Sequence, residues 1–165
     1  MKSMKLVRYQ PEYLEPMLAL HRSAMFDLEK LGLDIGISEH DEEVDLRAIE
    51  RIYFQSDGEF LIGLLGGAVI AMGGFQRLSS DSAELRRMRI RADLQDQGYG
   101  SQLLLKLERI ASKSGITRFT FETAKARPLT LEFYRKHGYQ EIGTGHYGKV
   151  ETVHFKKVLE KSLSS

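Results

Sequence analysis

A glycine-rich turn between two regular segments has the composition of an anion-binding loop. It consists of Gln95, Asp96, Gln97, Gly98, Tyr99, Gly100 and Ser101. Residues 83–90 before it are predicted to form a strand, and residues 103–111 after it carry apolar side chains at helical spacing. The first N–H groups of a helix have no partner within the helix and lie at the positive end of its dipole. The turn is therefore predicted to bind an anion, and phosphate is the usual one.

The spacing of the glycines excludes the two most common nucleotide-binding loops. A P-loop requires a lysine after its last glycine, but Gly100 is followed by Ser101 and Gln102. A dinucleotide fingerprint requires a third glycine at position 103, which is a leucine. The alternative without a function is a helix cap in which Gly98 and Gly100 only provide backbone freedom.

A second motif follows at residues 131–139, where a short predicted helix carries Tyr134 and ends at Gly138 and Tyr139. Together with the spacing of Gln95, Gly98 and Gly100, this motif resembles the GNAT superfamily of N-acetyltransferases. The order of elements over residues 83–139 is strand, loop, helix, strand, helix and strand, and it matches that superfamily too.

The resemblance implies an α/β (α+β) fold with a single mixed, mostly antiparallel sheet of about six to seven strands, flanked by about four helices. It implies an acyltransferase that moves an acetyl group from acetyl-CoA to the primary amine of a small molecule. Acetylation of a protein or peptide is one alternative, and a catalytically silent acyl-CoA sensor is another. No metal, nucleic acid or membrane partner is expected, and pairing of edge strands into a homodimer is left open.

In that superfamily the loop grips the diphosphate of acetyl-CoA, and the strand before it lies along the pantetheine arm. Carried over residue by residue, the resemblance assigns cofactor binding to Met88, Arg89, Ile90, Gln95, Asp96, Gln97, Gly98, Tyr99, Gly100, Ser101, Arg127 and Tyr134. The backbone N–H of Met88 is expected to face the thioester carbonyl. Arg127 stands where many relatives carry an asparagine, so a guanidinium replaces the usual amide.

Tyr134 is the candidate general acid for the departing thiolate. A phenol has a pKa of about 10 and a thiol one of about 8.5, so this proton transfer is only modestly uphill. The alternatives for Tyr134 are packing against the sheet or a plain hydrogen bond to the cofactor sulfur. The chain has no cysteine, which excludes a covalent acetyl-cysteine. Direct attack by the amine in a ternary complex is therefore expected.

Glu84 is the candidate general base, because a carboxylate there resembles the base position of some superfamily members. Strict alternation along the strand predicts that it shares a face with Arg86 and Met88. Burial is expected to raise its pKa. An ion pair with Arg86 or Arg118 is the alternative role, Glu122 is the competing carboxylate, and an essential base is not required if the amine binds neutral.

Charge is nearly balanced overall, at formal +1, but it is unevenly distributed. Residues 27–59 contain eleven acids and three bases, a net of −8. This segment is predicted either to attract a cationic amine or to form a solvated face. Four arginines at positions 86, 87, 89 and 91 precede the loop, on a strand expected to be buried and without the aromatic series typical of nucleic-acid binding. No pair of the five histidines has a helical metal-binding spacing.

The remaining elements are those of one domain, residues 1–160, followed by a polar tail at 161–165. The first residues lack the apolar run of a signal peptide, so a cytoplasmic location is expected. The apolar run 60–75 is short for a bilayer span, and Gly66 and Gly67 in its middle predict a hairpin between strands 59–65 and 68–77.

Towards the ends of the chain, residues 6–9 are predicted as a strand and a helix begins at Pro11. Residues 28–40 are predicted as a loop, and residues 41–54 as a helix. Strands 139–143 and 150–158 are expected to flank a loop at 143–148. In the superfamily, segments equivalent to 25–45 and 144–149 build the acceptor cleft.

Overall fold

The computed structural model describes residues 3–30 and 43–161 of the chain. The strands are β1 (Lys5–Arg8), β2 (Glu59–Leu65), β3 (Ala68–Arg77), β4 (Ser82–Ile90), β5 (Arg118–Ala124), β6 (Gln140–Tyr147) and β7 (Val150–Val158). The α-helices are α1 (Leu14–Lys30), α2 (Tyr99–Lys113) and α3 (Pro128–Lys136). Short helical turns are η1 (Pro11–Tyr13), η2 (Leu46–Ala48), η3 (Glu50–Phe54, a π-helical turn) and η4 (Ala92–Leu94).

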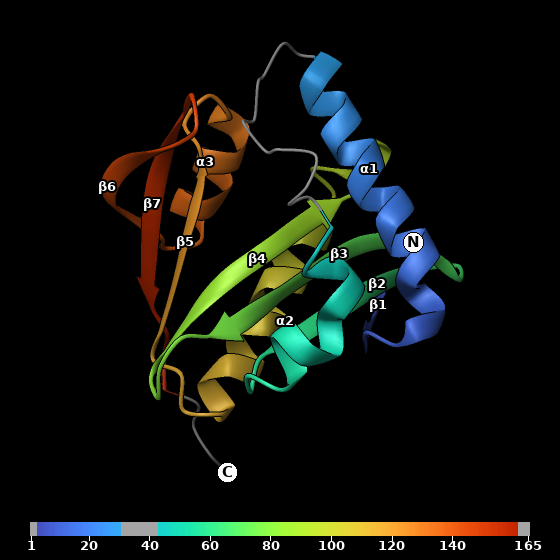
Figure 1. Ribbon diagram of the computed structural model, residues 1–165, viewed down its shortest axis with the longest axis horizontal. Coiled ribbons are helices and arrows are strands. Elements are labelled where there is room, and N and C mark those ends of the chain that lie inside the picture. Colours follow the sequence, from blue (N-terminus) through green and yellow to red (C-terminus); the bar gives the residue numbers. More distant parts are fainter. Residues whose placement is uncertain (1–2, 31–42, 162–165) are drawn as a thin grey trace.

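The strands form one seven-stranded mixed sheet in the order β1-β2-β3-β4-β5-β7-β6 (Figure 1). All neighbouring pairs are antiparallel except β4 and β5, which are parallel. The β2–β3 hairpin has the predicted bounds, and both residues of its turn, Gly66 and Gly67, have positive φ, as a tight hairpin turn requires. The predicted fold class is confirmed.

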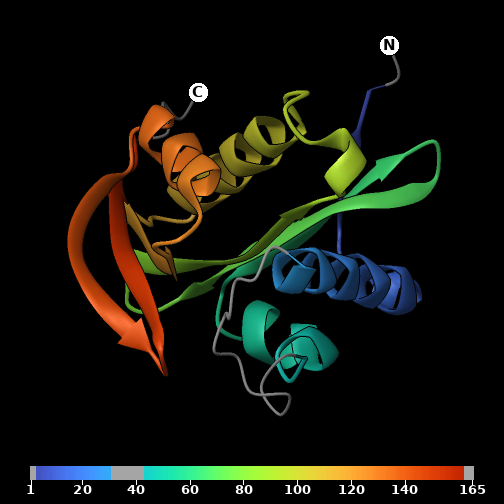
Figure 2. The same ribbon diagram turned by 90° about the horizontal axis from the view of Figure 1, so that it is seen from above.

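Helices cover both faces of the sheet, with α1, η2 and η3 on one face and α2 and α3 on the other (Figure 2). Each face has its own core. Met17, Leu46, Tyr53 and Phe60 belong to the first, and the second contains the three buried leucines of α2 together with aromatic residues of the sheet. No helix in the described part of the chain is long and apolar enough to cross a membrane.

The sheet divides between its two parallel strands. Residues Ser82–Glu84 of β4 pair with Arg118–Thr120 of β5, and pairing stops there. Figure 1 shows the two strands side by side at one end and diverging towards the other. The expected site residues Met88, Arg89 and Ile90 belong to the part of β4 beyond this pairing.

A β-bulge in β4 breaks the strict alternation of side chains that was predicted for this strand. Gly74 lies opposite Arg86 and Met72 lies opposite Arg89, so two residues of β4 face one residue of β3. Arg87, in the bulge, has φ +61°. The extra residue reverses the side-chain pattern, so that Met88 packs with the α2-side core while Glu84 and Arg86 remain on the α1 side. The expectation that Glu84 and Met88 share a face is therefore wrong.

Three further predictions were wrong in detail. Helix α1 continues to Lys30, past the point at which a loop was predicted to begin, and residues 31–42 lie outside the described range. Residues 46–54 form the short turns η2 and η3 instead of a continuous α-helix. Strand β6 runs to Tyr147, through most of the loop predicted at 143–148, and absorbs its irregularity in a bulge between Glu141 and Gly143.

Candidate active site

Two clefts open where β4 and β5 separate, one on each face of the sheet. The α3-side cleft has a volume of about 600 Å³ and is bounded by residues 95–101, the start of α2, and α3. The α1-side cleft has a volume of about 570 Å³ and lies between Met25, residues 44–52 and the β6–β7 turn. Leu85, Arg86, Arg87, Arg89, Glu122, Thr123 and Arg127 line both. Because these residues are shared, the clefts meet through the gap between the strands.

The backbone of β4 borders this gap. On one side β4 pairs with β3 as far as Ile90, but on the other side it pairs with β5 only as far as Glu84. The N–H and C=O groups that β4 turns towards β5 beyond Glu84 therefore have no strand partner and can pair with an extended ligand. Met88, Arg89 and Ile90, predicted to bind the cofactor, all line the α3-side cleft.

The predicted anion-binding loop leads directly into α2. Asp96 and Gly98 both have left-handed backbone conformations, with φ of +62° and +89°. Gly98 occupies the N-cap position and has no side chain to accept hydrogen bonds from the first turn of the helix. The N–H groups of Gly100 and Ser101 therefore receive no side-chain cap from Gly98 and point to a site for an external anion.

The two glycines of the loop are required for different reasons. A Cβ on Gly98 would meet no atom within 4 Å, so its left-handed φ is what favours glycine. A Cβ on Gly100 would lie 3.3 Å from the Phe133 ring, so Gly100 allows α2 to pack closely against α3. The side chains of Gln95 and Gln97 turn back onto the carbonyls of Ile90 and Asp93, at 3.3 and 3.5 Å, and hold the loop in shape.

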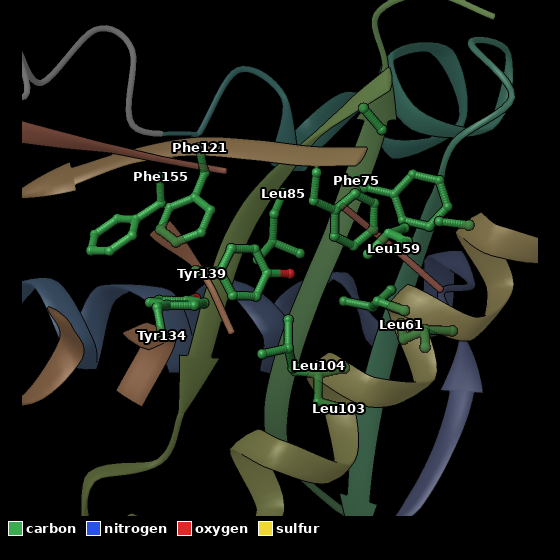
Figure 3. Close-up of a cluster of buried hydrophobic side chains, with 14 of the residues drawn as sticks. Leu61, Phe75, Leu85, Leu103, Leu104, Phe121, Tyr134, Tyr139, Phe155 and Leu159 are labelled. Carbon is green, nitrogen blue, oxygen red and sulfur yellow. The ribbon is translucent and has the colours of Figure 1, made fainter. Parts of the chain in front are cut away.

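Tyr134 lies at the α3 wall of its cleft and is 6% exposed. Its ring packs against Phe121, with centroids 4.2 Å apart, among Tyr139 and Phe155 (Figure 3). Burial raises the pKa of Tyr134, while the positive charges of Arg89 and Arg127 oppose that rise. The hydroxyl therefore keeps its proton at neutral pH and lies in the field of two guanidinium groups.

The two candidate bases line the α1-side cleft, and Glu84 forms the ion pair with Arg86 that was its alternative role. The Glu84 side chain is 42% exposed, so the expected burial is wrong, and it pairs with Arg86 at 3.3 Å. Glu122 accepts a hydrogen bond from Thr152 at 2.6 Å and lies 2.8 Å from His154 Nε2. Arg118 pairs with Asp81 instead, at 4.0 Å. Glu122 lines both clefts, whereas Glu84 lines only the α1-side cleft.

A buried hydrogen-bond network, which was not predicted from the sequence, joins the segment before β2 to β4. Asp45 accepts two hydrogen bonds from Arg87, at 2.7 and 3.1 Å, and one from the hydroxyl of Tyr53 at 2.6 Å. Burial alone would raise the pKa of Asp45, but the hydrogen bonds and charge of Arg87 hold it below its ordinary value. The only sequence signal for this pair was opposite charge, and the two residues are far apart in the chain.

The acidic segment is partly neutralised where the structure describes it. Glu43 accepts hydrogen bonds from Arg22 and Arg47, and Asp45 is paired with Arg87. Other acids of the segment, including Asp41, lie outside the described residues. Of the described acids of this segment, Asp45 lines the α1-side cleft. Met25 and Tyr147 line it, as expected for the acceptor segments.

Within the described part of the chain, no three histidine, cysteine or acidic side chains converge into a group that could hold a metal ion. His137 Nδ1 lies 2.8 Å from the carbonyl of Phe133, and His154 contacts Glu122. These two rings therefore have protein partners.

Solved structures share this architecture. An acetyltransferase from Streptococcus agalactiae 2603 is similar at 20% identity and a TM-score of 0.84, over 96% of this chain and 100% of that chain. PaiA N-acetyltransferase from Thermoplasma acidophilum, in complex with coenzyme A, is similar at 21% identity and a TM-score of 0.76, over 94% of this chain and 99% of that one. Ribosomal-protein-alanine N-acetyltransferase from Brucella melitensis is similar at 16% identity and a TM-score of 0.75, with the same coverage. Identities this low establish the fold alone.

The family comparison goes further than the structural one. The model of the Acetyltransferase (GNAT) family matches residues 18–139, well over half of the chain. The match includes β4, the anion-binding loop, α2 and Tyr134. The chain therefore belongs to the GNAT family of acetyltransferases and is an acyltransferase.

Proposed function

We propose that this protein transfers the acetyl group of acetyl-CoA to the primary amine of a small molecule, by direct attack in a ternary complex. The observation that carries the proposal is the junction of the two clefts across the gap between β4 and β5. Each cleft can admit one reactant, and the gap lets them meet. The absence of cysteine removes the acetyl-cysteine route.

The residues of the α3-side cleft fit coenzyme A. The N–H groups of Gly100 and Ser101, which receive no side-chain cap from Gly98, suit a diphosphate, and the unpaired edge of β4 suits the amides of the pantetheine arm. When bound, acetyl-CoA supplies the acetyl group as a reactive thioester. The N–H of Met88 is the proposed donor to the thioester carbonyl oxygen, where negative charge develops.

The two residues proposed for proton transfer lie on opposite sides of the junction. In the reaction a C–N bond forms, the C–S bond breaks, one proton leaves the amine and one is delivered to the sulfur. Tyr134, on the α3 side, is the proposed proton donor to sulfur, and Arg89 and Arg127 would stabilise its tyrosinate. Glu84, on the α1 side, is the proposed base, with Glu122 as the competing carboxylate.

Thiol release from acetyl-CoA across a panel of amines tests the proposal, and the protein itself contributes no thiol background. In Tyr134→Phe we expect kcat to fall about 100-fold, because one proton transfer is lost. The dissociation constant of coenzyme A should remain unchanged, because the ring is kept. Tyr13→Phe serves as the matched control. Full kcat in Tyr134→Phe would rule out the proposed acid.

The same assay separates the alternatives. Binding of coenzyme A without turnover of any amine or peptide would indicate a silent acyl-CoA sensor. Turnover of peptides but not of small amines would indicate a protein acetyltransferase, the activity named for the Brucella melitensis neighbour. Homodimer formation and a cytoplasmic location are also part of the proposal, and sedimentation analysis and cell fractionation test them.

A further inference from the structure

Two arginines at the junction of the clefts have no acidic partner in the described part of the chain. Arg86 pairs with Glu84, and Arg87 pairs with Asp45. Among the described residues, neither Arg89 nor Arg127 forms an ion pair. Both line the two clefts at once, so they border the space in which the reactants meet.

The guanidinium of Arg89 is enclosed and incompletely bonded. Its Nε is buried and has no hydrogen-bond partner among the described residues. Its Nη1 donates to the carbonyl of Met88 at 3.0 Å, and its Nη2 donates to the sulfur of Met25 at 4.0 Å. Burial, followed by the charges of Arg127 and Arg87, lowers the pKa of Arg89 to about 10.

A buried guanidinium without an ion-pair partner is energetically unfavourable, and a bound anion would offset this unfavourable free energy. Burying a charge without a partner is unfavourable, and a second guanidinium nearby adds repulsion. Arg89 belongs to the α1 side of β4, because its side chain reaches Met25 of α1. None of the residues 95–101 lines the α1-side cleft, so the diphosphate loop is elsewhere. The pantetheine arm between that loop and the sulfur carries no charge.

Building on the function proposed above, we infer that the acceptor is an amine that also carries an anionic group, a carboxylate or phosphonate, held by Arg89 and Arg127. The carboxylates of Glu84 and Glu122 line the same α1-side cleft and suit the ammonium end of such a zwitterion. The structure therefore favours amino-acid-like acceptors over polyamines and other purely cationic amines. This reverses the expectation of a cationic acceptor drawn from the acidic segment.

Matched pairs of amines test the inference. Each pair consists of an amino acid and its decarboxylated amine: phenylalanine with phenethylamine, lysine with cadaverine, and glycine with methylamine. Aminomethylphosphonate tests the phosphonate. In the wild type we expect kcat/KM to favour an anionic member at least about tenfold. In Arg89→Met this preference should disappear through a rise in KM, whereas the exposed Arg109→Met should retain it.

A second readout does not depend on turnover. The Arg89 Nε–Hε signal in a ¹H–¹⁵N spectrum is assigned by its loss in Arg89→Met and followed while each amine is added to protein saturated with coenzyme A. We expect the anionic amines to shift it and the decarboxylated amines to leave it in place. If Arg89→Met does not fold, Arg127→Met is used for the kinetic comparison.

The outcomes are distinct. Equal or better use of the decarboxylated amines, or an Arg89 signal that no anionic amine moves, overturns the inference. Failure of coenzyme A to bind overturns the proposed function instead, and the same spectra recorded without coenzyme A still decide whether Arg89 binds an anion.

Discussion

At the scale of single residues, His21 of α1 lies where a protonated, positively charged ring is strongly disfavoured. It is 1% exposed, and neither ring nitrogen has a hydrogen-bond partner among the described residues. Burial, followed by the charges of Arg89 and Arg87, lowers the pKa of His21 to about 4. The ring is therefore neutral at pH 7, and protonating it would oppose folding.

This predicts a loss of stability in mild acid. An unfolded histidine has a pKa of about 6.5, so between that pH and about 4 the unfolded chain binds the extra proton. Stability is therefore complete above pH 6.5 and falls as the pH drops, by about 2 kcal/mol at pH 5. Urea unfolding at pH 7 and pH 5 measures the loss.

A matched pair of variants isolates the ring responsible. His21→Leu should lack this part of the pH dependence, whereas the exposed His146→Gln should retain it. If His21→Leu loses as much stability between pH 7 and pH 5 as the wild type, the ring is not the cause.

At the scale of the elements, the β4 bulge and the segment before β2 form one structural unit. Arg87, in the bulge, donates hydrogen bonds to Asp45 just before η2. Asp45 also accepts a hydrogen bond from the hydroxyl of Tyr53 on η3. These bonds fix the α1-side wall to the strand that is proposed to lie beside the cofactor. The wall and the strand should therefore lose stability together.

We predict that Asp45→Ala lowers the free energy of unfolding by about 3 kcal/mol, because a buried carboxylate that accepts charged hydrogen bonds is lost. Chemical denaturation measures it. Glu50→Ala, an exposed acid on the neighbouring η3, is the control and should be close to neutral. Similar stabilities for the two variants would show that the Asp45 network contributes little.

Sequence reasoning was successful where local chemistry decides the structure. Gly66 and Gly67 specify a tight turn, and both ends of their hairpin were predicted correctly. It failed where pairing across the sheet decides. The bulge at Arg87 depends on the register of β3 against β4, and β6 passes through Gly143 because β7 supplies hydrogen-bond partners.

The candidate site shows the same division. The loop and Tyr134 could be proposed from two short motifs, each contained in a few consecutive residues, and the structure brings both motifs to one cleft. The predicted burial of Glu84 was wrong because its side chain lies at the wall of the open α1-side cleft. The lack of an ion pair at Arg89 could not be predicted from the sequence. It depends on which of the neighbouring arginines form ion pairs with Glu84 and Asp45, and in the structure these are Arg86 and Arg87.

At the scale of the whole molecule, a seven-stranded sheet that separates at its single parallel pair explains both clefts. The α3-side cleft leads to the start of α2, and Arg89 and Arg127 line both clefts where they meet. The central claim is that the turn before α2 holds coenzyme A through its backbone.

Calorimetric titration with coenzyme A tests that claim most directly. Gly98→Ala and Gly115→Ala are a matched pair, because both glycines have φ near +90° and neither Cβ would meet another atom. Both variants should suffer a similar backbone strain of about 1 kcal/mol, but only Gly98→Ala should weaken binding, by about tenfold. We expect one coenzyme A per wild-type chain. No heat of binding to the wild type, or equal affinities in the two variants, would contradict the account.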